Sequence, residues 1–314
     1  MPSPLQNALL IHNPNAGSGG ARRKKHLDEA QRILAAGGIQ AERAETRGPG
    51  DATTIARQAC ADGRQLVIAC GGDGTLNEVV NGLADPPGGR HVPLALFPAG
   101  TANVLAKELG IPWNIPRAAE FLLRCEPREI ALGLATPLAQ PEKRRYFVSV
   151  AGAGPDGQIV HSVDPQLKAR VGILAYWWQG IGEAFRYRFP RFRVTTAEKQ
   201  MDVTLVIAGR TRHYGGPFRI TTEASLLEDR FELCTLTTRS GLRYLSHLPA
   251  LALGMIRGRA GLFFWKSEKL LCEALGDDVV YAQVDGEALA RLPVEFRIVP
   301  RALTLMLPAG WKPK

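Results

Sequence analysis

The chain has 314 residues, of which 45% are hydrophobic and 22% are charged, as in an ordinary folded protein. Disorder, collagen-like repeats and coiled coil are therefore excluded as descriptions of the whole chain. The 39 Lys and Arg residues exceed the 30 Asp and Glu residues, and the net charge of +9 favours anionic partners. The two basic runs, at 22–25 and 143–145, are not interleaved with aromatic residues, so we expect no nucleic-acid partner.

The cysteine pattern and the N-terminus indicate a cytoplasmic protein. The five cysteines are far apart and include no CxxC pair, so a zinc knuckle or a thioredoxin-like site is not expected. Buried thiols in a reducing cytosol account for them most simply. The N-terminus lacks the basic and long apolar regions of a signal peptide, and no apolar run reaches the ~18 residues of a transmembrane helix.

The first part of the chain alternates predicted strands and helices. In chain order, the expected elements are a strand at 8–11, a helix at 21–36, a strand at 39–45, a helix at 51–61 with Asp51 as N-cap, a strand at 66–70, a helix from Leu76, a strand at 94–97 and a helix at 102–109. Thr75 and Glu78 have capping-box spacing, which predicts the helix start at Leu76. This alternation is typical of a doubly wound α/β domain, to which we assign residues 1–132.

The pattern changes after about residue 133, where alternating apolar and polar runs predict an antiparallel sandwich or barrel. The expected strands cover 145–150, 191–196, 202–208, 218–222, 230–236, 279–284 and 295–299. Two helices interrupt them, one with an apolar face at 167–185 and one at 242–257 that Pro249 should kink. We assign this β-rich domain to residues 133–302, with the boundary in the Pro-bearing segment Ala131–Pro141.

The loop Gly71–Thr75 follows a buried apolar run and precedes a helix. Ligands of open α/β sheets bind at the carboxyl ends of strands, where glycines let backbone N–H groups close around phosphate at a helix N-terminus. Asp73 within such a loop indicates a bound Mg²⁺ or a proton acceptor, and a tight turn in which Asp73 caps a helix is the alternative. The loops Asn13–Gly17 and Gly100–Asn103 should lie on the same sheet edge. The chain has no GxxxxGK[ST] and no GxGxxG after the first strand, which disfavours a P-loop or a dinucleotide site.

Three segments, Asn13-Pro14-(x)2-Gly17, Gly71–Glu78 and Pro98–Asn103, resemble the nucleotide motifs of the diacylglycerol kinase catalytic domain family, which includes bacterial lipid kinases and sphingosine kinases. The resemblance implies an ATP cleft between the two domains and a C-terminal segment, about 303–314, that returns to the first domain. The residues that it implies for ATP binding are Asn13, Pro14, Asn15, Ala16, Gly17, Thr46, Gly71, Gly72, Asp73, Gly74, Thr75, Leu76, Asn77, Glu78, Gly100, Thr101 and Asn103.

The segment Val284-Asp285-Gly286-Glu287 places two carboxylates two residues apart on a tight turn, where they can share a proton or a metal. Phosphoryl transfer to an alcohol needs a base near the hydroxyl, and the family resemblance implies that this pair is catalytic, together with Asp73. We expect Glu287 to accept the proton and Asp285 to orient it or to hold Mg²⁺, or the two roles to be exchanged. From the residues alone, an exposed hairpin turn is the alternative.

The segment 226–231 resembles the structural metal turn of the same family. The resemblance implies that the Asp229 carboxylate and the carbonyls of Leu226 and Phe231 hold Mg²⁺, which prefers oxygen ligands. Arg230 stands where the family usually has glycine, at a cost on the order of 1 kcal/mol if the position needs a positive φ. Ala131 and Val104 also stand where the family usually has Asp, so these departures leave the metal content and the turnover open.

Two aromatic clusters, Trp177-Trp178 and Phe263–Trp265, either pack in the core or contact lipid, with Arg186 and Arg188 near lipid headgroups. We therefore interpret the chain as an ATP- and Mg²⁺-dependent lipid kinase that phosphorylates a diacylglycerol-like or sphingoid-like hydroxyl. We expect a cytoplasmic protein that associates peripherally with an anionic membrane surface, and a homo-oligomer is possible. A soluble kinase similar to NAD kinases, which share a Gly-Gly-Asp-Gly-Thr loop, and a nucleotide- or lipid-binding module with weakened catalysis are the alternatives.

Overall fold

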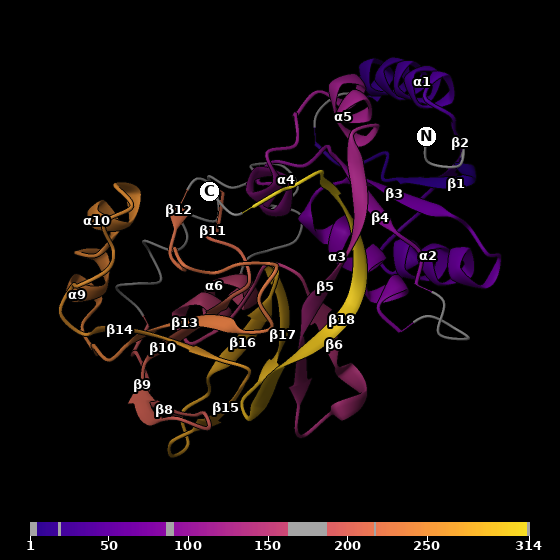
Figure 1. Cartoon of the computed structure of the whole chain (residues 1–314). Helices are drawn as coiled ribbons and strands as arrows, with labels where there is room; N and C mark the ends of the chain where they lie inside the picture. Colours follow the sequence, from indigo (N-terminus) through magenta and orange to yellow (C-terminus); the bar gives the residue numbers. More distant parts are fainter. Residues whose placement is uncertain (1–4, 18–19, 86–90, 163–186, 217, 313–314) are drawn as a thin grey trace. The chain divides into compact units, whose positions relative to one another are not determined.

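A computed structural model of the chain describes residues 5–17, 20–85, 91–162, 187–216 and 218–312 (Figure 1). The chain forms two compact units, one of Met1–Ala131 with Arg301–Lys314 and one of Leu132–Pro300. The helix expected at 167–185, the pair Trp177-Trp178 and Arg186 lie outside the described residues. In the part of the chain that is described, no helix is long and apolar enough to cross a membrane.

The first unit is a parallel sheet with helices on both faces, which confirms the doubly wound α/β fold. Its strands are β1 (Leu5–His12), β2 (Ile39–Glu45), β3 (Leu66–Gly71) and β4 (Leu94–Pro98), in the order β2-β1-β3-β4. The C-terminal part of β18 (Val294–Pro308) continues this sheet, because Leu305 pairs with Leu94 in parallel. The helices are α1 (Gly20–Ala36), α2 (Asp51–Ala61), α3 (Asp73–Leu83), α4 (Val104–Leu109) and α5 (Ile115–Leu122). Helix α1 packs with α5 and α2 packs with α3, and the two pairs lie on opposite faces of the sheet in Figure 1.

The second unit is built on antiparallel strands. One sheet has the order β14-β13-β10-β7-β16-β17. Its strands are β7 (Val150–Ala153), β10 (Leu205–Gly209), β13 (Phe231–Leu236), β14 (Leu262–Ser267), β16 (Tyr281–Val284) and β17 (Glu287–Arg291). Strand β5 (Cys125–Pro137) pairs with β6 (Arg145–Phe147). The first part of β18 pairs with β15 (Lys269–Ala274), which pairs with β8 (Phe192–Thr195), and β8 pairs with β9 (Gln200–Val203). Strands β11 (His213–Tyr214) and β12 (Phe218–Arg219) form a separate pair. The helices are α6 (Pro155–Ser162), α9 (Gly241–Leu245) and α10 (Leu248–Ala252), with a short 3₁₀ helix at Pro141–Lys143.

Aromatic side chains join the strand layers of the second unit. The ring of Phe231 on β13 stacks on Phe147 of β6 with centroids 5.6 Å apart. Phe147 also meets Phe296 of β18 edge to face at 6.4 Å. All three side chains are buried, so this contact fills the core of the antiparallel sandwich that the sequence predicts.

Helix α3 begins at Asp73 rather than at Leu76, so the predicted capping box is wrong. Gly72 is the N-cap, and Thr75 lies inside the helix. The Glu78 carboxylate accepts hydrogen bonds instead from the backbone N–H groups of Gly50, at 2.9 Å, and Ala52, at 3.2 Å. It therefore serves the N-terminus of α2, a segment distant in sequence.

Five other expected features differ. Gly50, with φ 87°, is the N-cap of α2 in place of Asp51, which is the first helical residue. The expected boundary segment at 131–141 is largely strand β5, and the expected strands at 145–150 and 202–208 are each two strands. The single kinked helix is two short ones, α9 and α10. Pro249 lies in the first turn of α10, where its missing N–H costs nothing.

Candidate functional site

The three glycine-bearing loops of the first unit lie against one another at the carboxyl ends of β1, β3 and β4. Asn13 Nδ2 donates to Thr75 Oγ1 at 3.2 Å, which joins the first loop to α3. The second and third loops touch backbone to backbone, because a Cβ added to Gly72 would lie 3.2 Å from Cα of Gly100. Any residue larger than glycine would therefore separate these loops.

Asp73 fastens the second loop to the third. Its Oδ1 accepts the backbone N–H of Val104, the first residue of α4, at 2.7 Å. The capping role that the sequence left as an alternative is thus present, although the capped helix is α4 and not the helix on which Asp73 lies. Burial lowers the pKa of Lys107 one turn further along α4, and the negative charge of Asp73 acts in the opposite direction.

The residues that the resemblance implies for ATP binding differ in their exposure to solvent. Asn15, Gly17 and Thr101 are exposed. The buried members are Thr46, Thr75, Leu76, Asn77 and Asn103. The Asn103 amide braces the third loop from within, because its Oδ1 accepts from Gly100 N at 3.0 Å and its Nδ2 donates to Gly100 O at 2.8 Å.

Arg23 is a residue of this site that the sequence analysis missed. It is buried while its neighbours Arg22, Lys24 and Lys25 are exposed. Its Nη1 donates to the carbonyls of Asn13 at 3.2 Å and Pro14 at 2.9 Å. A basic run on a helix predicts a solvated face, and only the close approach of the first loop turns one member inward. The guanidinium places a positive charge directly behind that loop.

In the second unit the Asp285 carboxylate holds the chain between β6 and β7. Oδ2 accepts from Val148 N at 3.0 Å, and Oδ1 accepts from Ser149 N at 2.9 Å and from Val150 N at 3.0 Å. Asp285 has a positive φ of 48°, which is uncommon for a residue other than glycine. Glu287 opens β17 two residues later and is half-buried. The predicted pair is therefore on a hairpin turn, with Asp285 engaged by the backbone.

A buried polar chain connects this turn to α6. Gly286 N donates to Gln283 Oε1 at 2.8 Å, and Gln283 Nε2 donates to Asp156 Oδ2 at 2.6 Å. Tyr214 Oη donates to the other oxygen of Asp156. The sequence analysis missed these three side chains. The segment Ala153-Gly154-Pro155-Asp156, a strand end running into a helix, is the signal that could have indicated Asp156.

Asp156 also lines an apolar pocket of the second unit. The pocket is partly open, and its 810 Å³ of empty space includes the solvent at its mouth. Apolar side chains make most of its wall, among them Ile159, Leu205, Ile207, Ile220, Leu236, Leu248, Leu251 and Ile256. Tyr244 contributes its hydroxyl, whose pKa is raised by burial and further by the charge of Asp156. The pocket is thus apolar with a few polar groups at Asp156.

The aromatic cluster on β14 faces two directions, as alternate residues of a strand must. Phe264 packs against the core beside the pocket, beneath the guanidinium of Arg257 at 4.6 Å. Phe263 and Trp265 instead lie under Lys199 Nζ, at 5.3 Å and 4.8 Å. Phe264 therefore packs in the core, as one of the two alternatives has it, and Phe263 and Trp265 contact Lys199.

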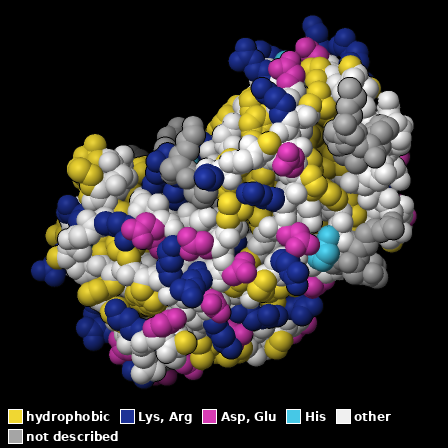
Figure 2. All heavy atoms as spheres, in the orientation of Figure 1, with side chains coloured by type: hydrophobic (Ala, Val, Ile, Leu, Met, Phe, Trp, Pro, Cys, Tyr) yellow, Lys and Arg dark blue, Asp and Glu magenta, His cyan; other side chains and the backbone are white. Residues whose placement is uncertain are grey.

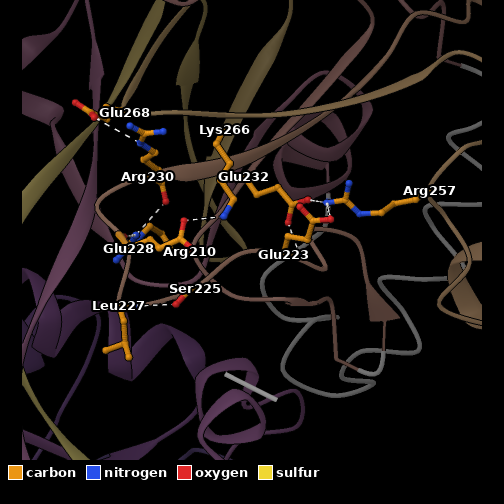
Figure 3. Close-up of polar contacts among 10 residues, drawn as sticks. All are labelled: Arg210, Glu223, Ser225, Leu227, Glu228, Arg230, Glu232, Arg257, Lys266 and Glu268. Carbon is orange, nitrogen blue, oxygen red and sulfur yellow. Dashed lines mark hydrogen bonds and ion pairs between the residues drawn. The ribbon is translucent and has the colours of Figure 1, made fainter. Parts of the chain in front are cut away.

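The turn resembling a metal site holds a guanidinium (Figure 3). Arg210, which is 0% exposed, donates from Nη2 to the Leu226 carbonyl at 2.8 Å, and from Nη1 to the carbonyls of Glu228 and of Arg230, the latter at 3.1 Å. Leu226 is one of the implied metal ligands. Two unit charges about 4 Å apart repel by ~4 kcal/mol at an effective dielectric constant near 20, so these residues do not fit a Mg²⁺ on the same carbonyl. The described residues include no group of three His, Cys, Asp or Glu side chains placed to hold a metal.

Arg230 does not carry the backbone cost considered for it. Among the described residues, Arg230 is not one of the non-glycine residues that have a positive φ. Its side chain is exposed and points to Glu268, with Nε and Oε1 3.7 Å apart.

Comparison with known proteins gives the family. The model of the diacylglycerol kinase catalytic domain matches residues 7–135, and the model described as YegS C-terminal NAD kinase beta sandwich-like domain matches residues 149–307. The chain belongs to the diacylglycerol kinase family. A diacylglycerol kinase of Bacillus subtilis (strain 168) is 29% identical over 313 residues, which are 97% of each protein. One of Staphylococcus aureus (strain bovine RF122 / ET3-1) is 28% identical over 306 residues, 96% of this chain and 93% of the relative.

Solved structures show the same fold. A crystal structure of a diacylglycerol kinase from Bacillus anthracis str. Sterne superposes with a TM-score of 0.71 at 20% identity, over 98% of both chains. Another structure from that organism gives a TM-score of 0.79 at 21% identity, over 99% of this chain and 98% of the other. The matched family and the names of these relatives support a kinase of the diacylglycerol kinase type.

Proposed function

We propose that the chain is a lipid kinase that uses ATP and Mg²⁺ to phosphorylate a lipid hydroxyl. The observation that carries the proposal is the apolar pocket of the second unit, which the chain Asp156–Gln283–Gly286 connects to the Asp285–Glu287 turn. A pocket with this wall suits an acyl chain, and Asp156 supplies a polar group for the headgroup end. The relatives named as diacylglycerol kinases support the same substrate class.

The loops of the first unit would hold ATP. Backbone N–H groups at the start of α3 and the charge of Arg23 favour phosphate, and the lack of side chains at Gly72 and Gly100 lets the second and third loops lie together. Mg²⁺ bound with ATP would neutralise charge on the phosphates.

Glu287 is the proposed proton acceptor, because both carboxylate oxygens of Asp285 accept backbone hydrogen bonds. The lipid oxygen attacks the γ-phosphorus, the bond from that phosphorus to the bridging oxygen of ADP breaks, and the hydroxyl proton moves to the Glu287 carboxylate. Asp285 positions the turn rather than meeting the substrate.

The segment 239–259 supports the proposed contact with an anionic membrane surface. Leu242, Leu253 and Met255 are 71%, 69% and 62% exposed on or beside α9 and α10, whose inner residues line the pocket. Exposed Arg239, Arg243 and Arg259 belong to the same segment. In Figure 2 hydrophobic side chains gather where Figure 1 places α10, with Lys or Arg beside them. Apolar and basic side chains together suit the headgroup region of a bilayer.

The test is transfer of labelled γ-phosphate from ATP with Mg²⁺ to a panel of hydroxylated lipids in mixed micelles, with NAD included. We expect a labelled lipid. Label on NAD alone would establish the soluble-kinase alternative, and binding of ATP without any labelled product would establish the binding module.

Two variants test the assigned residues in the same assay. Glu287→Gln should lower kcat at least ~100-fold, since it removes the base. Asp73→Asn should also abolish transfer while it retains an oxygen to accept the Val104 N–H, so that a loss reports the charge and not the helix cap. The control is Glu268→Gln, which changes an exposed carboxylate. Full activity of Glu287→Gln would contradict the role of Glu287.

A further inference from the structure

The carbonyl groups of Leu226, Glu228 and Arg230 point to one place. They belong to alternate residues of the turn that precedes β13, and all three accept hydrogen bonds from Arg210. Figure 3 shows Arg210 with Glu228 and Arg230. Converging carbonyl oxygens repel one another unless a cation or hydrogen-bond donors lie among them. The geometry is therefore that of a cation site, and its occupant is a side chain of this protein.

The surrounding charges also match a cation. An arginine guanidinium stays protonated in proteins, and the acidic residues Glu228 and Asp229 belong to the same turn. Arg210 follows β10 directly, and its own N–H donates to Ser149 O at 2.8 Å, so the guanidinium is held by the sheet.

The outer side of the turn is closed by ion pairs with β14 and the residue after it. Lys266 Nζ lies 2.7 Å from Glu228 Oε2, and Arg230 Nε lies 3.7 Å from Glu268 Oε1. Arg230 and Lys266 are the more exposed cations, at 58% and 32% of their side chains, so they offer matched controls for the buried one.

We propose that Arg210 is the resident cation of the 226–230 turn, and that its guanidinium replaces the divalent metal that the family resemblance implies there. The turn, and the strand β13 that follows it, are then held without Mg²⁺. A planar guanidinium suits this place because two of its nitrogens donate to three separate carbonyls at hydrogen-bond distance, whereas Mg²⁺ needs its oxygen ligands octahedrally arranged at about 2 Å. The inference does not depend on the lipid substrate, because its tests measure stability alone.

The first experiment compares thermal unfolding of the full-length protein without nucleotide, in EDTA and in millimolar Mg²⁺, for wild type and Asp229→Asn. We expect Mg²⁺ to change the midpoint of unfolding of wild type and of Asp229→Asn by the same amount, within about 1 °C. An ion that does not bind the native turn adds no stability. A Mg²⁺-dependent rise in wild type that Asp229→Asn removes would overturn the proposal.

The second experiment replaces the guanidinium. Arg210→Met should lower the midpoint by about 10 °C, because it leaves buried carbonyls and carboxylates without their cation. Arg230→Met and Lys266→Met should each lower it by less than about 3 °C, as exposed ion pairs do. A midpoint of Arg210→Met equal to that of Arg230→Met would overturn the proposal.

If Arg210→Met does not fold, Arg210→Lys provides the measurement. It retains the charge but not the fork of donors, and we expect its midpoint to lie below those of wild type, Arg230→Met and Lys266→Met. A wild-type midpoint in Arg210→Lys would show that any cation suffices, against the specific guanidinium role.

Discussion

Asp285 and Glu287 lie two residues apart, yet the fold uses their carboxylates differently. Three backbone N–H groups, of Val148, Ser149 and Val150, converge on Asp285, and all three belong to buried residues. Glu287 lies at the start of β17, where its side chain is half-buried. A carboxylate that accepts three backbone hydrogen bonds anchors the turn, and its neighbour is the better candidate for chemistry.

Asp285→Ala should therefore reduce the free energy of unfolding by roughly 3 kcal/mol, since it leaves buried N–H groups without their charged acceptor. Urea unfolding followed by circular dichroism measures this change. Glu287→Ala is the control and should stay within about 0.5 kcal/mol of wild type. Equal effects of the two substitutions would show that Asp285 is not the anchor.

At the scale of elements, the packing of α3 against α2 determines where the loop Gly71–Thr75 lies. Glu78 and Gly82 are four residues apart on the same face of α3. Thr53 Oγ1 donates to Glu78 O at 2.9 Å, and a Cβ added to Gly82 would lie 2.5 Å from Thr53 O and 2.6 Å from the Cβ of Ala56. The two helices thus touch closely within the last two turns of α3.

Gly82→Ala should destabilise the protein by about 2 kcal/mol, because the extra methyl group forces α2 and α3 apart. The urea midpoint reports this loss. Gly48→Ala, at a glycine with nothing within 4 Å of an added Cβ, should be close to neutral. An unchanged midpoint for Gly82→Ala would mean that the helices separate at no cost.

At the scale of the whole molecule, free cysteines report the integrity of both units. Cys60 and Cys70 are buried in the first unit, Cys234 and Cys272 are buried in the second, and Cys125 is half-exposed. Burial raises the pKa of Cys70 and of Cys234 to about 12, and it also raises the pKa of Cys60 and Cys272 above their ordinary value of 9.0. These thiols stay protonated and shielded while the units are folded.

A thiol reagent at pH 8 should label Cys125 first in native protein, and all five cysteines in denaturant. The raised pKa values also give a sign for pH dependence. Their contribution to stability is complete below about pH 9 and is lost as pH rises, because the thiols of the unfolded chain ionise first. Rapid native labelling of Cys70 or Cys272, or stability that increases above pH 9, would contradict this description.

The sequence predicted the elements that local pattern controls. Helix α2 and strand β2 have the predicted bounds, and β3 and β4 each extend one residue past theirs, since continuous apolar runs bounded by turn residues leave few choices. Contacts between distant segments decided the rest. Glu78 fits a local capping box but serves Gly50, and Arg23 and Arg210 look like surface charges until folding brings carbonyl groups to them. Asp156 and Gln283 are 127 residues apart, so no spacing rule could pair them.

The last strand of the first unit is also the last strand of the chain, and this order matters during synthesis. β4 ends at Pro98, but the segment that pairs with its open edge begins only near Arg301. At 5–20 residues per second the ribosome needs roughly 10–40 s to make the intervening ~200 residues. Throughout that interval β4 presents an unpaired apolar edge, a template for association between nascent chains. The segment after Arg301 must therefore be made before the sheet of the first unit is sealed, and a chain that stops short of this segment would keep the edge open and be prone to aggregate.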